Sequence, residues 1–229
     1  GTVGVTGALS VTSGETITDS GVITVAGTSS FTTDVNDKDI ILNQSNAMSG
    51  NITVSTAGTG GDVTIDNGTT ALGIEGTVNG ALILTAGAAI TDSDTLTVSG
   101  ASTFNIDTGS NHITLGTAAL TAAIGVSTTG TSNFTLDNTT TAVNLGTVGV
   151  TGALSVTSGE TITDSGVITV GGTSSFTTDV NDKDIVLNLE HAMSGNITVS
   201  TEGTEGDVTI DNGNTPLGIE GTVRGALIL

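Results

Sequence analysis

The feature that most constrains this chain is a long internal repeat. Residues 1–84 return as residues 146–229 without a gap, at an offset of 145, and ten of the 84 aligned positions differ. Residues 85–145 form a spacer between the two copies. Because a fixed internal period is typical of repeat architectures, we interpret residues 1–229 as one continuous repeat array rather than as a set of separate globular domains.

The ten differing pairs are mostly changes of size or polarity. They are Ala26/Gly171, Ile41/Val186, Gln44/Leu189, Ser45/Glu190, Asn46/His191, Ala57/Glu202, Gly60/Glu205, Thr69/Asn214, Ala71/Pro216 and Asn79/Arg224. The two changes to glutamate at residues 202 and 205 add charge in an expected loop, so we expect no tight packing there.

The spacer itself carries a weaker copy of the same pattern. GALILTAGAAITDSDTLTVSGASTF at 80–104 aligns with GALSVTSGETITDSGVITVAGTSSF at 7–31, at an offset of 73. Residues 126–131 echo residues 54–59 at an offset of 72. The 145-residue period therefore contains two diverged units of about 72–73 residues each.

Short bursts of alternating apolar residues predict the secondary structure. They include Val3–Val5, Leu9–Val11, Ile23–Val25 and Ile52–Val54, and turn residues such as Asp66-Asn67-Gly68 separate them. Period two indicates short strands, and no helical stripe persists. A unit of about 72 residues divides into three or four coils of about 18–24 residues, which predicts an all-β fold of the β-solenoid type.

Composition supports a thin, regular core. The chain has 34 Gly, four Phe, no Trp and no Tyr, and its apolar residues are mainly small or β-branched. Stacked coils place like residues above one another, which suits Val, Ile and Thr. Tandem β-sandwich repeats are the alternative fold. They usually have a buried aromatic anchor and about 100 residues per domain, and this chain has neither.

The charge is strongly one-sided. Three basic residues face 23 acidic ones, for a formal charge of −20. Phosphate binding requires Lys and Arg, so nucleic acid is not an expected partner. No run approaches about 18 apolar residues, so we expect no membrane insertion. The chain has no Cys and therefore no disulfide. It starts at Gly1, and we expect any signal peptide to have been removed or to lie outside this window.

The two quoted segments, 7–31 and 80–104, resemble the Thr- and Gly-rich β-strand repeats of giant bacterial surface proteins, the filamentous-haemagglutinin-like and autotransporter-type adhesins. The resemblance implies a right-handed parallel β-helix that is secreted to the bacterial cell surface. It also implies a role in adhesion, in biofilm or in a surface filament.

Residues that could support catalysis are few and scattered. Lys38 and Lys183 are copies of one position, Arg224 replaces Asn79, and His191 replaces Asn46. His112 lies in the spacer, and no Ser/His/Asp set can be assembled twice. A polysaccharide-cleaving site needs clustered carboxylates and cations. We therefore assign no catalytic, cofactor-binding or metal-binding residue and expect no enzyme.

An acidic segment raises the question of calcium. Asp34, Asn36, Asp37 and Asp39 recur as Asp179, Asn181, Asp182 and Asp184. Hard cations prefer such oxygens, but the segment lacks the Gly and the bidentate Glu of an EF-hand loop, and Thr59–Asp62 falls short of the calcium-roll repeat. We favour a solvated acidic corner without a cofactor. A calcium site would instead predict a higher melting temperature with Ca²⁺ than with EDTA.

Two further motifs are weak. Thr-x-Thr runs at 16–18, 95–97 and 161–163 are similar to those of ice-binding β-helices, but they occur about once per 72-residue unit, so we expect no contiguous rank. Asn-x-Ser/Thr sequons would be surface candidates for glycosylation; they are Asn43, Asn51, Asn67, Asn133, Asn138 and Asn196.

Two functional hypotheses remain. The first is an extracellular structural filament or matrix fibre without catalysis, extended by self-association end to end or by continuation of the same chain. The second is the stalk of a giant adhesin that presents a binding domain outside this window. An open solenoid end has unpaired strand edges that either continuation or a neighbour would cover. The sequence does not identify a host or matrix glycan that the protein would bind.

Overall fold

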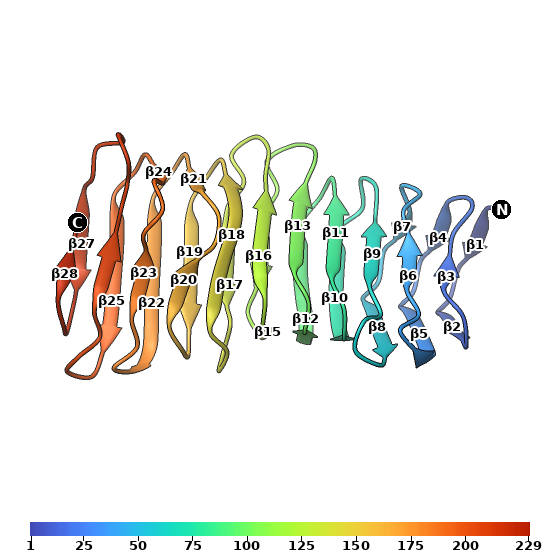
Figure 1. Ribbon diagram of the computed structural model, residues 1–229. Coiled ribbons are helices and arrows are strands. Elements are labelled where there is room, and N and C mark those ends of the chain that lie inside the picture. Colours follow the sequence, from blue (N-terminus) through green and yellow to red (C-terminus); the bar gives the residue numbers. More distant parts are fainter.

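The computed structural model describes all residues 1–229 and contains strands and turns but no helix. Every strand pairing is parallel, and the chain winds in turns stacked along one axis, with the N- and C-termini at opposite ends (Figure 1). The chain is therefore a β-solenoid, as the sequence predicts. No helix is present that could cross a membrane.

Two long sheets form the two faces of the solenoid, and each turn contributes one strand to each. Eleven strands follow one another along the path of each sheet, so the chain makes about eleven turns. One sheet has 12 strands: β2 (Leu9–Ser13), β5 (Ser29–Asn36), β8 (Ile52–Ala57), β10 (Leu72–Val78), β12 (Ile90–Val98), β14 (Ile113–Leu115), β17 (Phe134–Asp137), β19 (Leu154–Ser158), β22 (Ser174–Asn181), β25 (Ile197–Glu202) and β27 (Ile219–Thr222), with β15 (Ala118–Leu120) beside β12.

The opposite sheet has 13 strands. They are β3 (Ile17–Thr18), β6 (Ile40–Leu42), β9 (Val63–Asp66), β11 (Leu82–Ala86), β13 (Ser102–Ile106), β16 (Ala123–Ser127), β18 (Val143–Val150), β20 (Ile162–Asp164), β23 (Ile185–Leu187), β26 (Val208–Ile210) and β28 (Leu227–Ile228), with β21 (Ile168–Val170) and β24 (Ala192–Met193) off the main path. A small third sheet contains β1 (Val3–Val5), β4 (Ile23–Val25) and β7 (Ala47–Met48).

The sequence repeat spans a whole number of turns. The path from β2 to β19 has seven steps, and Leu9 on β2 and Leu154 on β19 occupy equivalent positions of the two copies. Individual turns vary in length: Val11 pairs with Phe31, 20 residues on, and Phe31 pairs with Val54, 23 residues on. The predicted coil length is confirmed.

The core is one continuous column of apolar side chains between the two faces. It contains 47 buried hydrophobic residues, and all four Phe residues lie within it. Alternation along each strand sends every second side chain inward, as in the pattern of β13, where Ser102, Phe104 and Ile106 are buried. Each turn thus buries its apolar residues against the turns above and below, which explains why a chain poor in aromatics folds.

Positive φ occurs at the corners and also within β10 and β27, at Gly76 and Gly221. Eight glycines adopt it, as expected, but the other three residues are Asp37, Thr139 and Asp182, not asparagines. Asn138 lies one position before Thr139 and is buried instead.

Candidate functional site

The 12-stranded face presents columns of hydroxyl groups to solvent. The register of the parallel strands aligns outward-facing Ser and Thr residues from turn to turn. One column runs through six turns: Thr91, Thr114, Thr135, Ser155, Ser175 and Thr198. A second runs through five: Thr12, Thr32, Ser55, Thr77 and Thr97.

The Thr-x-Thr runs do not align into a contiguous rank of their own. Thr18 and Thr163 lie in the 13-stranded sheet, and of the three runs only 95–97 contributes to a column, through Thr97. Most turns contribute Ser-x-Thr or Thr-x-Ser instead, and only the register shows that these align. Glu75 and Glu220 interrupt the ranks with negative charge.

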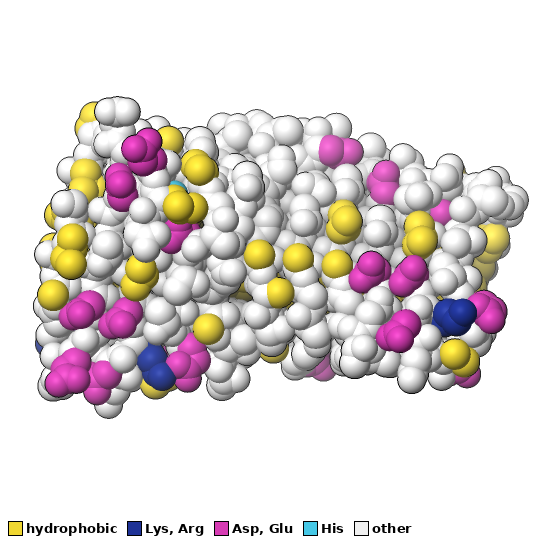
Figure 2. Space-filling model, in the orientation of Figure 1, with side chains coloured by type: hydrophobic (Ala, Val, Ile, Leu, Met, Phe, Trp, Pro, Cys, Tyr) yellow, Lys and Arg dark blue, Asp and Glu magenta, His cyan; other side chains and the backbone are white.

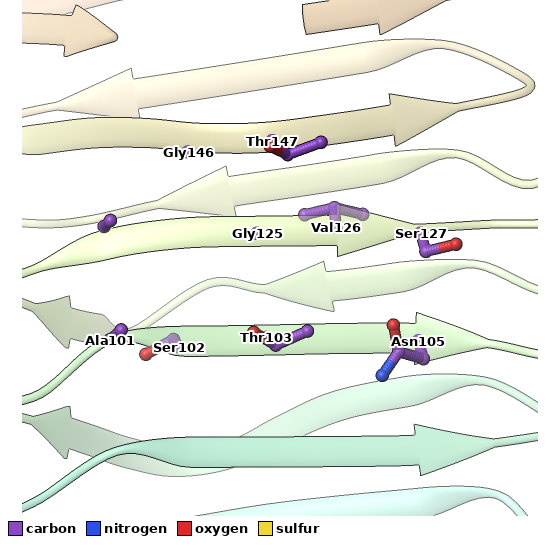
Figure 3. Close-up of a pocket in the computed structure, with 10 residues that line it drawn as sticks. Ala101, Ser102, Thr103, Asn105, Gly125, Val126, Ser127, Gly146 and Thr147 are labelled. Carbon is purple, nitrogen blue, oxygen red and sulfur yellow. The ribbon is translucent and has the colours of Figure 1, made fainter. Parts of the chain in front are cut away.

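The 13-stranded face carries a shallow hollow of about 340 Å³ (Figure 3). It opens where the outward positions of neighbouring strands are Gly125 and Gly146, which have no side chain. Thr103, Asn105 and Thr147 line it, and none of its ten lining residues is charged. A site of this kind offers hydroxyl and amide groups but no acid, base or activated nucleophile.

The acidic corner uses its carboxylates to hold the next turn of the chain. Asp37 Oδ1 accepts hydrogen bonds from the main-chain N–H groups of Thr59 (2.9 Å) and Gly60 (2.9 Å). Asp39 Oδ1 accepts one from the N–H of Asp62 (2.9 Å). These bonds connect turns about 23 residues apart, so the acidic residues are structural links between coils.

The second copy repeats this arrangement. Asp182 Oδ1 accepts hydrogen bonds from the N–H groups of Thr204 (2.8 Å) and Glu205 (3.0 Å). Because these bonds stabilise the carboxylate, they lower the pKa of Asp182 below its usual value. The structure has no group of three or more His, Asp or Glu side chains placed to hold a metal ion.

The acidic side chains gather toward the two ends of the solenoid, and few cover the middle turns on the side that Figure 2 shows. The lysines lie among them and pair across turns: Lys38 Nζ lies 2.6 Å from Glu15, and Lys183 Nζ lies 2.5 Å from Glu160. Neither lysine meets a histidine or a second cation in these pairs.

The residues weighed for catalysis do not converge. His112 Nδ1 accepts a hydrogen bond from the N–H of Asn133 (3.0 Å), and His191 lies buried against Asp164. Arg224 is exposed at another position, where its main-chain N–H donates to Thr201. The lysines and histidines each contact a different neighbouring residue, and none of these contacts joins two of them.

Buried asparagines are the structural residues that sequence reasoning missed. Asn67 Oδ1 accepts from the N–H of Met48 (2.9 Å), and its Nδ2 donates to the carbonyl of Met48 (3.0 Å). Asn138 makes the same pair of bonds to Leu120, and Asn212 makes them to Met193. Main-chain pairing between strands stops at each of these corners. There the carboxamide makes the two hydrogen bonds that the main chain of a neighbouring strand would otherwise make.

Two of the sequons are therefore not surface sites. Asn67 and Asn138 are fully buried, and their amide nitrogens donate to carbonyl groups. Glycosylation of either would break these bonds. The sequence signal that could have identified them is the recurring Asp-Asn pair at 66–67, 137–138 and 211–212.

Comparison with known proteins identifies a repeat family but no activity. A family model described as repeats of unknown function (DUF5649) matches residues 1–55, 60–129 and 131–200. No curated protein and no solved structure matches the chain.

Proposed function

Since the chain belongs to this family of repeats of unknown function, we propose that its role is mechanical: an extracellular structural filament or matrix fibre without catalysis. The observation that carries the proposal is the unbroken stacking of eleven turns over one core. Because each turn is stabilised by its neighbours, length can increase by adding turns without a new kind of contact.

Two further observations support a mechanical role. The candidate acids, lysines and histidines make structural contacts between turns instead of converging on one pocket. The charge of −20 favours solubility and repulsion between the sides of neighbouring molecules. We propose that the fibre extends by continuation of the same chain or by end-to-end self-association, in which exposed strand edges pair.

The decisive test of this proposal is where the protein lies relative to the cell envelope. Antibodies raised against residues 1–229 and used for immunogold labelling of intact producing cells should decorate thin filaments outside the cell envelope. Deletion of the repeats from the gene should remove both the label and the filaments. Label that appears only after the cells are permeabilised would contradict the proposal.

The adhesin stalk is a competing version of the same architecture. In that case, shortening the array by one 145-residue repeat would shorten a projection yet leave surface attachment dependent on a separate domain. Filament mass measured by electron microscopy, alongside an attachment assay, separates the two. Attachment lost in proportion to the number of repeats favours the fibre.

A second candidate function follows from the hydroxyl columns on the 12-stranded face. Adjacent turns are about 4.8 Å apart and alternate residues of a strand about 6.7 Å apart, so β19, β22 and β25, which each carry two outward hydroxyl groups, form a small two-column hydroxyl array. Such an array could order water at the surface of ice. A thermal-hysteresis assay tests it, with Ser175→Lys, in the middle of this array, as the variant that should abolish any effect. Absence of hysteresis in the unaltered protein would end this candidate.

A further inference from the structure

Asn46 and His191 occupy equivalent positions in the two copies and share one main-chain frame. The N–H of Asn46 donates to the carbonyl of Asp66 (3.0 Å), and the N–H of His191 donates to the carbonyl of Asp211 (3.1 Å). Asn46 is 1% exposed and His191 2% exposed. The substitution therefore places a titratable ring where the other copy buries a carboxamide.

One hydrogen bond of the Asn46 carboxamide goes from Nδ2 to the carbonyl of Leu42 (3.3 Å), and two others close the corner. Its Oδ1 accepts from the main-chain N–H of Ile23, at 2.7 Å, and its Nδ2 donates to Asp19 Oδ2, at 2.8 Å. The bond to Ile23 joins the corner before β7 to the first residue of β4 on the preceding turn.

The imidazole of His191 keeps the first of these two corner bonds. Its Nδ1 accepts from the main-chain N–H of Ile168, the first residue of β21, at 3.1 Å. Its Nε2 lies 3.4 Å from Asp164 Oδ2 but makes no hydrogen bond. Only the neutral ring with its proton on Nε2 can accept at Nδ1, so the corner requires this single tautomer.

Protonation would break this closure. A proton on Nδ1 would face the N–H of Ile168, donor against donor, and the buried main-chain N–H would lose its acceptor. Asn46 has no corresponding titration, because a carboxamide keeps its acceptor at every pH used for proteins.

The charged groups around the ring are acidic. Asp164 faces it from β20, Asp211 lies beyond β26 on the following turn, and Glu190 precedes it in the chain. Asp164 and Asp211 favour the imidazolium form, but burial of the ring outweighs them and lowers the pKa of His191.

We propose that His191 is an acid-sensitive latch, which releases β21 from the corner before β24 in the C-terminal copy and has no counterpart in the N-terminal copy. The latch rests on the hydrogen-bond frame that the two copies share and on the one side chain by which they differ there.

The direction of the pH dependence follows from linkage. A histidine whose pKa is lower in the folded chain binds its proton more readily after opening. The latch is therefore fully closed above the unfolded pKa of about 6.5 and is lost as the pH falls through the folded pKa. Carboxylates with ordinary pKa values stay ionised down to about pH 5, so the test is confined to the range from about pH 5 to 7.5.

Nuclear magnetic resonance of the unaltered protein gives the first test, because the chain has only two histidines, His112 and His191. We expect His191 to show the Nε2–H tautomer at neutral pH and to titrate below 6.5. Exchange of the Ile168 amide, corrected for its intrinsic rate, should rise by up to about tenfold per pH unit on acidification, whereas the Ile23 amide should not respond. A ring protonated at Nδ1, or equal responses of the two amides, would overturn the proposal.

The second test swaps the side chains at positions 46 and 191 by mutation. His191→Asn should abolish the acid response of the Ile168 amide, and Asn46→His should create one at Ile23. An acid response that persists at Ile168 in His191→Asn contradicts the latch. Should either variant fail to fold, the titration of the unaltered protein still decides the question.

Discussion

Phe104 and Phe134 stack across the core, with ring centroids 6.5 Å apart and planes inclined by 28°. Phe104 belongs to β13 on one face and Phe134 to β17 on the other, so this contact joins the two long sheets. Both rings are fully buried. It lies within the diverged spacer, where the sequence repeat is weakest.

Truncation of Phe134 should therefore destabilise the spacer. We expect Phe134→Ala to cost about 3–5 kcal/mol, because it removes a large buried side chain and leaves a cavity, and Phe134→Leu to cost less. Urea unfolding monitored by circular dichroism measures both. Equal losses for the two variants would indicate that ring stacking, not volume, dominates.

Gly76 should not tolerate a side chain. It lies at φ 117°, and a Cβ there would overlap the carbonyl oxygen of Val54 on the adjacent turn. We expect Gly76→Ala to lower stability by about 1–3 kcal/mol or more. Gly149→Ala is the matched control, since its Cβ would meet only an ordinary contact at 3.7 Å. A comparable drop in melting temperature for both would refute the steric explanation.

Asn138 should be far more sensitive than an exposed asparagine. Asn138→Ala leaves the buried N–H and carbonyl of Leu120 without their partner, and each unsatisfied group costs about 1–3 kcal/mol. Asn43→Ala serves as the control, because Asn43 is exposed. Thermal unfolding of the two variants compares them, and similar midpoints would show that the buried carboxamide is dispensable.

The lowered pKa of Asp182 predicts an acid-labile corner. A carboxyl group with a depressed folded pKa contributes stability that is present above the unfolded value and is lost as the pH falls through the folded value. Asp182→Asn tolerates the positive φ but removes the charge, so it should flatten the pH dependence below about pH 4. Asp179→Asn is the control. Parallel pH profiles for the unaltered chain and Asp182→Asn would contradict this role.

Calcium should have no effect on the acidic corner. Asp37 and Asp39 each use Oδ1 to accept main-chain N–H groups of the next turn, which opposes recruitment of those oxygens by a cation. We expect superimposable melting curves in Ca²⁺ and in EDTA. A higher melting temperature with Ca²⁺ that disappears in Asp37→Asn would establish a calcium site.

Much of the architecture could be predicted from the sequence because it depends on local pattern and period. Bursts such as Val3–Val5 and Ile52–Val54 lie in strands, and the coil length follows from the repeat. The hydroxyl columns could not be predicted, because they depend on register between turns of unequal length. Thr135 and Ser155 align only because β17 and β19 pair at that offset.

The hydrogen-bond partners of the buried polar residues could not be predicted from the sequence either. Asn138 looks like a turn residue, and nothing local indicates that its amide completes the hydrogen bonding of Leu120, 18 residues earlier. The structural role of His191 likewise depends on Ile168 and Asp164, which contact its ring from the preceding turn. Such contacts are set by stacking, whereas sequence patterns report mainly on neighbours along the chain.

Because the sequence repeat spans seven whole turns, the length of the molecule changes in fixed steps when a repeat is gained or lost. A whole number of turns means that gaining or losing one repeat in the gene changes length by about 34 Å, seven strand spacings of about 4.8 Å. The same change returns every surface column to its original azimuth, apart from the accumulated twist of the stack. Recombination between the near-identical copies could thus reset length in discrete steps while leaving each face continuous.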